Sequence, residues 1–336
     1  MPHRELDDKS APKARESPEP PKPRRRRLRK IGAVGGGVLL LGAAATVTVL
    51  AVNGSGAPPK PDLARVAPDY RRLAASLPWP TDGQTALWAD GVGPLGTCGK
   101  QTPVPIASVA KVMTAYVVLR DHPLESGSDQ GPDVVVDDQA GYEAFSRDES
   151  SAPVRAGQRI SERRLLELML VPSANNVARL LARWDAGTEP AFVAEMNATA
   201  AALGMKDTVY TDPAGFDAAT RSTAADQLKL AESALTDSTL LDLTAQRGTS
   251  VPDDPTALPN TDALLGDDGV VGGKTGSSTP AGGALMWAAR RTIGGQDRLV
   301  LGVVLHQDAG TTAEQGLARA LTVSRRLIGE LGKGGA

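Results

Sequence analysis

Ser108 and Lys111 lie three residues apart in a stretch that carries few other polar side chains. The pattern of residues 108–121 predicts a helix that is apolar nearly all round, as is typical of a buried helix. Side chains at positions i and i+3 share one helix face and lie within reach of each other. Burial disfavours the charge of a lysine, and a neutral amine can accept the proton of a neighbouring hydroxyl. The pair therefore has the spacing of a nucleophile and its general base.

This spacing is not specific by itself. Ser10 and Lys13 show the same spacing in the polar N-terminal segment, where no core could form around them. A serine at the start of a helix also commonly serves as an N-cap. A catalytic role for Ser108 therefore needs support from other parts of the chain.

Two further polar segments supply candidate partners. Ser173 and Asn175 lie at a corner between two predicted helices, where short polar side chains often serve only as helix caps. Lys274 follows two glycines at the end of a predicted strand. A phosphate-binding loop is not favoured there, because Asp268 stands in the place of its first glycine.

In this order the segments resemble the Ser-x-x-Lys, Ser-x-Asn and Lys-Thr-Gly motifs of the penicillin-recognising serine enzymes. Longer stretches resemble one branch, the low-molecular-mass D-alanyl-D-alanine carboxypeptidases. These stretches are residues 106–115, 192–197, 203–205, 212–216, 273–276 and 281–283. The resemblance covers roughly residues 80–310, nearly all of the part expected to fold.

The resemblance implies a hydrolase that removes the terminal D-alanine of peptidoglycan stem pentapeptides through an acyl-enzyme on Ser108. Lys111 would take the proton of the serine hydroxyl. Ser173 would relay a proton to the leaving D-alanine, and Asn175 would hold Lys111 and the substrate amide. β-Lactams imitate the substrate, so they are expected to acylate Ser108 as well. No cofactor is implied.

The resemblance also assigns the substrate-binding residues, which are expected to be Lys274, Thr275, Gly276 and Ser277. Lys274 and Thr275 would bind the terminal carboxylate, and Gly276 would let the strand approach the substrate closely. The backbone N–H groups of Ser108 and Ser277 would form the oxyanion hole.

Two other functions stay open. A serine β-lactamase would need a carboxylate that activates the deacylating water, and Glu195 is the candidate, although its surroundings match the carboxypeptidase stretch. A catalytically silent cell-wall-binding or β-lactam-sensing module would keep the fold, although the full set of motif residues argues against it. Ala174 and Arg221 stand where relatives usually have Gly and often have His, so substrate preference is left open.

The elements that must position these groups predict an α+β fold. Strands are predicted near both ends of the folded part, at residues 84–89, 269–275, 284–289 and 299–305. Helices are predicted at residues 108–121, 165–171, 176–184, 191–203, 223–235 and 311–331. This order favours an antiparallel sheet flanked by helices, with a helical subdomain, as the resemblance also implies.

The N-terminal part of the chain predicts attachment to a membrane. Residues 1–30 are polar, end in a basic run and predict a disordered cytoplasmic tail. The uncharged residues 31–52 are long enough for a single transmembrane helix, with the remainder exported. A cleaved signal peptide, which would release the protein, is the alternative for this segment. Residues 53–68 predict a linker, and residues 69–331 predict the catalytic domain.

Composition excludes several other classes of function. The formal net charge is -2 and no basic stripe is interleaved with aromatics in the second half, so nucleic acid is not an expected partner. Cys98 is the single cysteine, and we expect it as a small buried side chain. His3, His122 and His306 lack metal-ligand spacing, so no metal site is expected and a Ser-His-Asp triad is not favoured.

Overall fold

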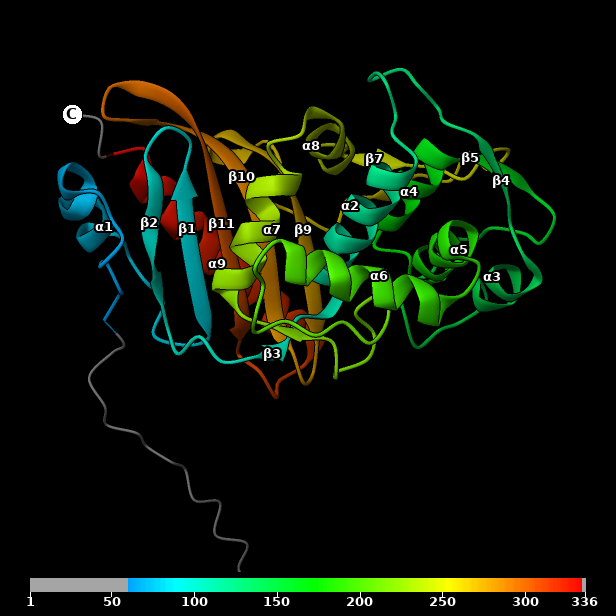
Figure 1. The fold of residues 1–336 in the computed structure, drawn as a ribbon, viewed down its shortest axis with the longest axis horizontal. Helices are drawn as coiled ribbons and strands as arrows, with labels where there is room; N and C mark the ends of the chain where they lie inside the picture. The colour runs from blue at the N-terminus through cyan, green and yellow to red at the C-terminus, as the bar shows by residue number, and fades with distance from the viewer. Residues whose placement is uncertain (1–59, 334–336) are drawn as a thin grey trace, which may run out of the picture. The chain divides into compact units, whose positions relative to one another are not determined.

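The computed structural model describes residues 60–333, which are built on a five-stranded antiparallel sheet (Figure 1). Its strand order is β2-β1-β11-β10-β9, so the first two strands of the chain join the last three through the pairing of β1 with β11. The strands are β1 (Gln84–Ala89), β2 (Gly93–Cys98), β9 (Val270–Ser278), β10 (Gly282–Ile293) and β11 (Gln296–Gln307). The chain between β2 and β9 is therefore one long insertion, which carries helices α2 to α8.

Three small two-stranded sheets lie in that insertion and connect its segments. They are β3 (Val104–Pro105) with β6 (Arg221–Ser222), β4 (Asp133–Val135) with β5 (Arg159–Ser161), and β7 (Gly248–Thr249) with β8 (Leu258–Pro259). Of these, the β3–β6 pair ties the approach to the Ser108 turn to the segment that precedes α7.

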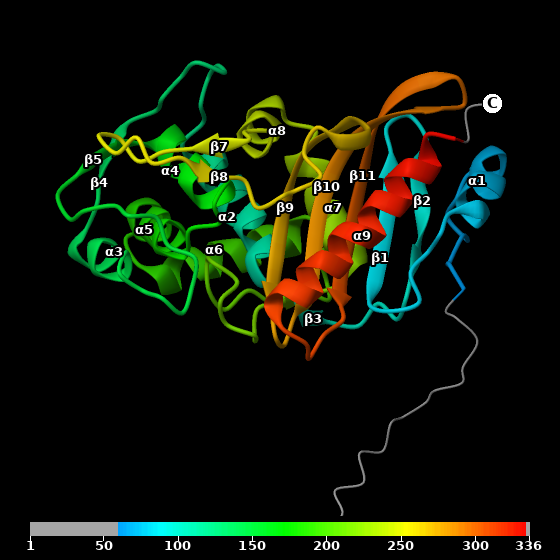
Figure 2. The same cartoon turned by 180° about the vertical axis from the view of Figure 1, so that it is seen from behind.

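Helices cover both faces of the large sheet. Figure 2 shows α9 across one face, and Figure 1 shows α7 across the other, with the remaining inserted helices beyond β9. The helices are α1 (Arg71–Ser76), α2 (Lys111–Asp121), α3 (Asp138–Glu143), α4 (Glu162–Leu170), α5 (Asn175–Ala186), α6 (Glu189–Ala202), α7 (Ala224–Ala234), α8 (Ser238–Thr244) and α9 (Ala313–Leu331). Three 3-10 turns are η1 (Pro68–Tyr70), η2 (Ala107–Ala110) and η3 (Asp267–Gly269). The predicted α+β fold with an antiparallel sheet is confirmed.

The sheet separates two apolar cores because successive strand residues point to opposite faces. On β10, Met286 packs into the core shared with α2, α4, α5 and α7. Its neighbour Trp287 packs into the second core, together with Leu327 of α9. The sheet therefore forms a rigid support, and its edge strand β9 borders the helical insertion.

Several elements differ from the sequence-based expectation. Strand β2 was not expected, because Gly93, Pro94 and Gly96 weaken the strand pattern. Residues of the expected linker also contact the sheet: Asp62 exchanges backbone hydrogen bonds of 2.7 and 3.1 Å with Thr97 of β2.

The predicted membrane segment lies outside the part of the chain that the structure describes. Residues 1–30 and 31–52, and the expected linker up to residue 59, lie outside the described residues. Within residues 60–333, no helix is both long and apolar enough to span a membrane.

Gly302 on β11 provides a test of how tightly the second core is packed. A Cβ atom at this position would lie 2.1 Å from Cζ2 of Trp287, which is its cross-strand partner. We expect Gly302→Ala to lower the free energy of unfolding by about 1–3 kcal/mol, because the buried indole has no room to move. Urea unfolding monitored by circular dichroism measures this change.

Gly329 on α9 is the matched control, because no neighbouring atom lies within 4 Å of its added Cβ. Gly329→Ala should raise the free energy of unfolding by up to about 1 kcal/mol through helix propensity. Equal effects of the two substitutions would contradict this account of the core.

Candidate active site

Ser108 lies on the turn η2, at the entrance to α2 and against the edge strand β9. Ala107, the residue before it, has a left-handed backbone with a φ of 46°, a conformation uncommon outside glycine. A Cβ atom at Gly276 of β9 would lie 2.9 Å from the carbonyl oxygen of Ile106 and 3.1 Å from the amide nitrogen of Ser108. Gly276 therefore allows the strand to pack against the serine turn, a contact the sequence did not suggest.

Lys111 is fully buried at the start of α2, and its amine has three acceptors. Nζ donates to Oγ of Ser108 over 2.9 Å, to Oδ1 of Asn175 over 2.6 Å and to the carbonyl oxygen of Ala214 over 2.8 Å. Burial and the nearby charge of Lys274 hold the pKa of Lys111 well below its usual value, and the carboxylate of Asp212 opposes them. A neutral amine beside a serine hydroxyl can act as its base.

Asn175 continues this network toward the helical subdomain. Its Nδ2 donates to Oε2 of Glu149 over 2.7 Å, and Arg179 donates to both oxygens of the same carboxylate. Burial raises the pKa of Glu149, but the hydrogen bonds from Arg179 and Asn175 outweigh it and leave that pKa lowered. The sequence analysis did not identify Glu149 or Arg179 as part of this site. Glu149 belongs to no motif, whereas Arg179 follows Asn175 by one turn of α5, a spacing that places the two side chains on one face of the helix.

The carbonyl group that holds Lys111 comes from the loop at residues 212–216. The Asp212 carboxylate accepts backbone hydrogen bonds from Ala214 and Phe216, which closes the loop. Gly215 has a φ of 73°, and a Cβ atom there would lie 1.9 Å from the carbonyl oxygen of Ala107. The loop thus packs directly on the serine turn.

Ser173 lies near this network without joining it by a hydrogen bond. It has a φ of 67° at the corner between α4 and α5, and only 5% of its surface is exposed. Its hydroxyl forms no hydrogen bond with any residue of the described part of the chain. The structure therefore brings together Ser108, Lys111 and Asn175, and leaves the side chain of Ser173 uncommitted.

Lys274 and Thr275 lie side by side on β9, both buried. Burial lowers the pKa of Lys274 to about 7, and the charge of Asp262 opposes this shift. Nζ of Lys274 donates to the carbonyl oxygen of Thr275 over 2.9 Å, and Oγ1 of Thr275 lies 2.5 Å from Oγ1 of Thr261. The buried amine of Lys274 therefore loses its positive charge readily, and an incoming anion would stabilise that charge.

A cleft of about 470 Å³ opens over Ser108, Asn175 and Ser277. Neither His122 nor His306 lines it. Its rim carries charged and aromatic side chains from loops and from the start of α9, namely Arg147, Asp148, Glu149, Phe216 and Glu314. A serine hydroxyl with a buried amine behind it and a cleft in front of it is suited to acyl transfer.

Comparison with known proteins agrees with this geometry. Residues 96–309 match the peptidase S11 family, described as D-alanyl-D-alanine carboxypeptidase. The chain belongs to this family. Among curated S11 relatives, the D-alanyl-D-alanine carboxypeptidase DacB2 of Mycobacterium tuberculosis is 33% identical over 251 residues, which are 71% of this chain and 81% of that protein.

Other proteins similar to this chain are named as an endopeptidase and as a transpeptidase. A D-alanyl-D-alanine endopeptidase of Pseudomonas aeruginosa is 42% identical over 128 residues, but this match spans only 38% of that protein and 38% of this S11 chain. The solved Streptomyces K15 DD-transpeptidase has a TM-score of 0.64 and 25% identity, covering 76% of this chain and 98% of that one. Proteins that are similar to this chain are therefore named for different reactions.

The lowered pKa of the buried Lys274 predicts how the stability of this S11 peptidase depends on pH. The pKa of Lys274 is about 7 in the folded protein, whereas a lysine in an unfolded chain has a pKa of about 10.4. Between these values the unfolded state binds one more proton, so this residue makes the free energy of unfolding rise with pH. Lys274→Met removes that contribution, and the rise from about pH 7 to about pH 9 should shrink by about 2 kcal/mol.

Urea unfolding at several pH values measures this dependence. Lys100→Met is the control, because Lys100 is exposed, and it should leave the pH dependence unchanged. If Lys274→Met and the wild type show the same dependence, Lys274 keeps its charge in the folded protein and the account is wrong.

Proposed function

We propose that this chain is a serine-type D-alanyl-D-alanine carboxypeptidase that removes the terminal D-alanine from peptidoglycan stem pentapeptides. The observation that carries the proposal is the hydrogen bond of 2.9 Å between Nζ of Lys111 and Oγ of Ser108. This amine is fully buried and its pKa is strongly lowered, so it is suited to take the serine proton near neutral pH. Membership of the S11 family supports the choice of substrate.

In the first half of the proposed reaction, Oγ of Ser108 attacks the carbonyl carbon of the penultimate D-alanine while its proton moves to Nζ of Lys111. The backbone N–H groups of Ser108 and Ser277 stabilise the oxyanion that forms. The C–N bond then breaks, and the leaving amine of the terminal D-alanine takes up the proton held by Lys111, which becomes neutral again. Ser173 relays this proton from Lys111 to the amine, a role for which its uncommitted hydroxyl is available. The peptide is left as an ester of Ser108.

In the second half, water replaces the departed D-alanine. Lys111, again neutral, accepts a proton from the water as the water oxygen adds to the ester carbonyl carbon. The bond between that carbon and Oγ of Ser108 breaks, and the proton returns to the serine. Asn175 keeps the amine in place through its hydrogen bond of 2.6 Å, so the same base serves both halves.

Selection of a free C-terminus follows from Lys274 and Thr275. The pKa of Lys274 is about 7, so near neutral pH much of this buried group is uncharged in the absence of a partner. A substrate carboxylate would stabilise the protonated amine, and the hydroxyl of Thr275 would donate to the same carboxylate. We propose that this pairing restricts the enzyme to peptides that end beside the scissile bond.

β-Lactams are expected to acylate Ser108, and the structure favours slow rather than rapid release of that ester. A β-lactamase would need an available carboxylate to activate water. Glu195, the candidate from the sequence, lies on α6 beside Arg120 and does not line the cleft. Glu149 does line the cleft, but both of its oxygens accept hydrogen bonds from Arg179. These contacts support the carboxypeptidase over the β-lactamase.

A fluorescent penicillin tests the nucleophile directly. The wild type should become covalently labelled, and Ser108→Ala should show no label because the attacking oxygen is gone. D-Alanine release from a muramyl pentapeptide should fall by at least about 10³-fold in the same variant. Labelling is followed by gel fluorescence and D-alanine release by a D-amino acid oxidase assay.

The same assays separate the alternatives. Sustained hydrolysis of nitrocefin without D-alanine release would identify a β-lactamase, and no labelling of the wild type would leave a catalytically silent module. Thr102→Ala, an exposed site near the turn that does not line the cleft, is a matched control that should label normally.

We also propose that residues 31–52 anchor the enzyme in the cell membrane by a single helix, with the catalytic domain outside the cytoplasm. The uncharged run and the basic residues before it support this orientation. In a bacterial host, the full chain should stay in the membrane fraction after an alkaline wash, and its domain should be digested by protease added outside. A shortened product that lacks residues 31–52 and leaves the membrane would show a cleaved signal peptide instead.

A further inference from the structure

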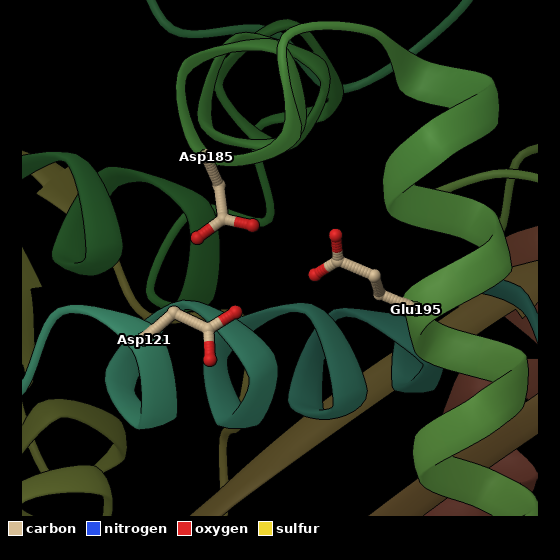
Figure 3. A group of neighbouring side chains, drawn as sticks. All are labelled: Asp121, Asp185 and Glu195. Carbon is tan, nitrogen blue, oxygen red and sulfur yellow. The ribbon is translucent and has the colours of Figure 1, made fainter.

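Three carboxylates from three different helices converge on the far side of the helical subdomain. Asp121 ends α2, Asp185 is near the end of α5, and Glu195 lies on α6. One oxygen of each lies within 4.8 Å of an oxygen of both others. Figure 3 shows the three side chains pointing toward a common centre. None of them lines the cleft above Ser108.

Asp185 is the buried member of this carboxylate cluster. Only 2% of its side chain is exposed, and its buried Oδ1 accepts no hydrogen bond. Nε2 of His122 lies 3.0 Å from that oxygen, so a protonated imidazole would form an ion pair with it. Asp121 and Glu195 are 35% and 41% exposed, which leaves the cluster open to solvent on one side. Burying a carboxylate with no hydrogen bond on one oxygen is costly unless a cation reaches it.

The charges around the cluster are not balanced by the protein alone. Arg120 donates to both oxygens of Asp121 over 2.8 and 2.9 Å and lies 3.8 Å from Glu195. Three carboxylates and one guanidinium leave a formal charge of -2 when His122 is neutral. Burial raises the pKa of Asp185, and the charges of Asp121 and Glu195 raise it further, while His122 acts in the opposite direction. The buried Glu162 adds another carboxyl group near Asp185.

We propose that Asp121, Asp185 and Glu195 bind a divalent cation, and that Ca²⁺ is the cation that fits. The ligand atoms are all carboxylate oxygens, which hard cations prefer. Ca²⁺–oxygen distances of about 2.3–2.6 Å place opposite ligands up to about 5 Å apart, in agreement with the spacing of the three oxygens. Water completes the coordination on the exposed side. Mg²⁺ fits less well, because it requires near-ideal octahedral geometry and these ligands come from separate helices.

Such a cation would link the helices that carry the active-site lysine and asparagine. Lys111 begins α2 and Asp121 ends it, whereas Asn175 begins α5 and Asp185 lies near its end. Helices α2, α5 and α6 pack against one another between these points. The cation would therefore stabilise the helical subdomain at the end opposite the cleft, without contact to the reacting atoms.

Thermal unfolding and terbium luminescence test the proposal on the EDTA-treated protein. CaCl₂ should raise Tm by about 2–5 °C, because a ligand that binds the folded state stabilises it. Tb³⁺ should give luminescence on tryptophan excitation, since Trp184 precedes Asp185 and stacks on His122 with ring centroids 4.1 Å apart. Excess CaCl₂ should quench this signal. Absence of both responses would overturn the proposal.

Substitutions separate a cation site from an ion pair. Asp185→Asn should abolish the Ca²⁺-dependent rise and leave Tm in EDTA equal or higher, because it relieves repulsion. His122→Gln should keep the Ca²⁺ response, and so should Asp133→Asn at an exposed site. The opposite pattern, a lower Tm for Asp185→Asn in EDTA and no response of the wild type to Ca²⁺, would show that the His122 ion pair alone explains the cluster. A response that survives Asp185→Asn would place the cation elsewhere and also overturn the proposal.

Discussion

The candidate active site depends above all on the burial of the Lys111 amine beneath Ser108. Removing an amine from water is costly unless its hydrogen bonds are replaced. Three acceptors replace them here, from the serine turn, from the start of α5 and from the loop at residues 212–216. The same burial lowers the pKa of the amine, which suits it to the proposed role as a base. The position of each of these segments therefore affects the pKa and the orientation of the Lys111 amine.

Close backbone packing holds those segments together. Gly276 lets the edge strand β9 pack against the serine turn, and Gly215 lets the 212–216 loop pack against Ala107 from another direction. Neither contact leaves room for a Cβ atom. The strand itself is supported by the rest of the sheet, whose two faces are covered by separate apolar cores. The serine turn is thus held between a rigid sheet and the helical subdomain.

A second buried amine, that of Lys274, lies on the edge strand β9. Burial lowers the pKa of both lysines, and the charge of Lys274 lowers the pKa of Lys111 further. Carboxylates partly oppose this lowering: Asp212 raises the pKa of Lys111, and Asp262 raises the pKa of Lys274. Such a site suits the proposed reaction, in which Lys111 would act as a neutral base and Lys274 would bind an incoming carboxylate.

The sequence alone predicted the α+β fold, the order of the main elements and the pairing of Ser108 with Lys111, because these depend on local periodicity and on short motifs. It did not predict strand β2, whose glycines and proline weaken the pattern, or the role of Glu149 and Arg179 behind Asn175. Nor did it indicate that Asp121, Asp185 and Glu195 meet. These features arise where helices and loops far apart in the chain pack together. Only the tertiary structure decides such contacts, since no local pattern records which distant side chains share a buried space.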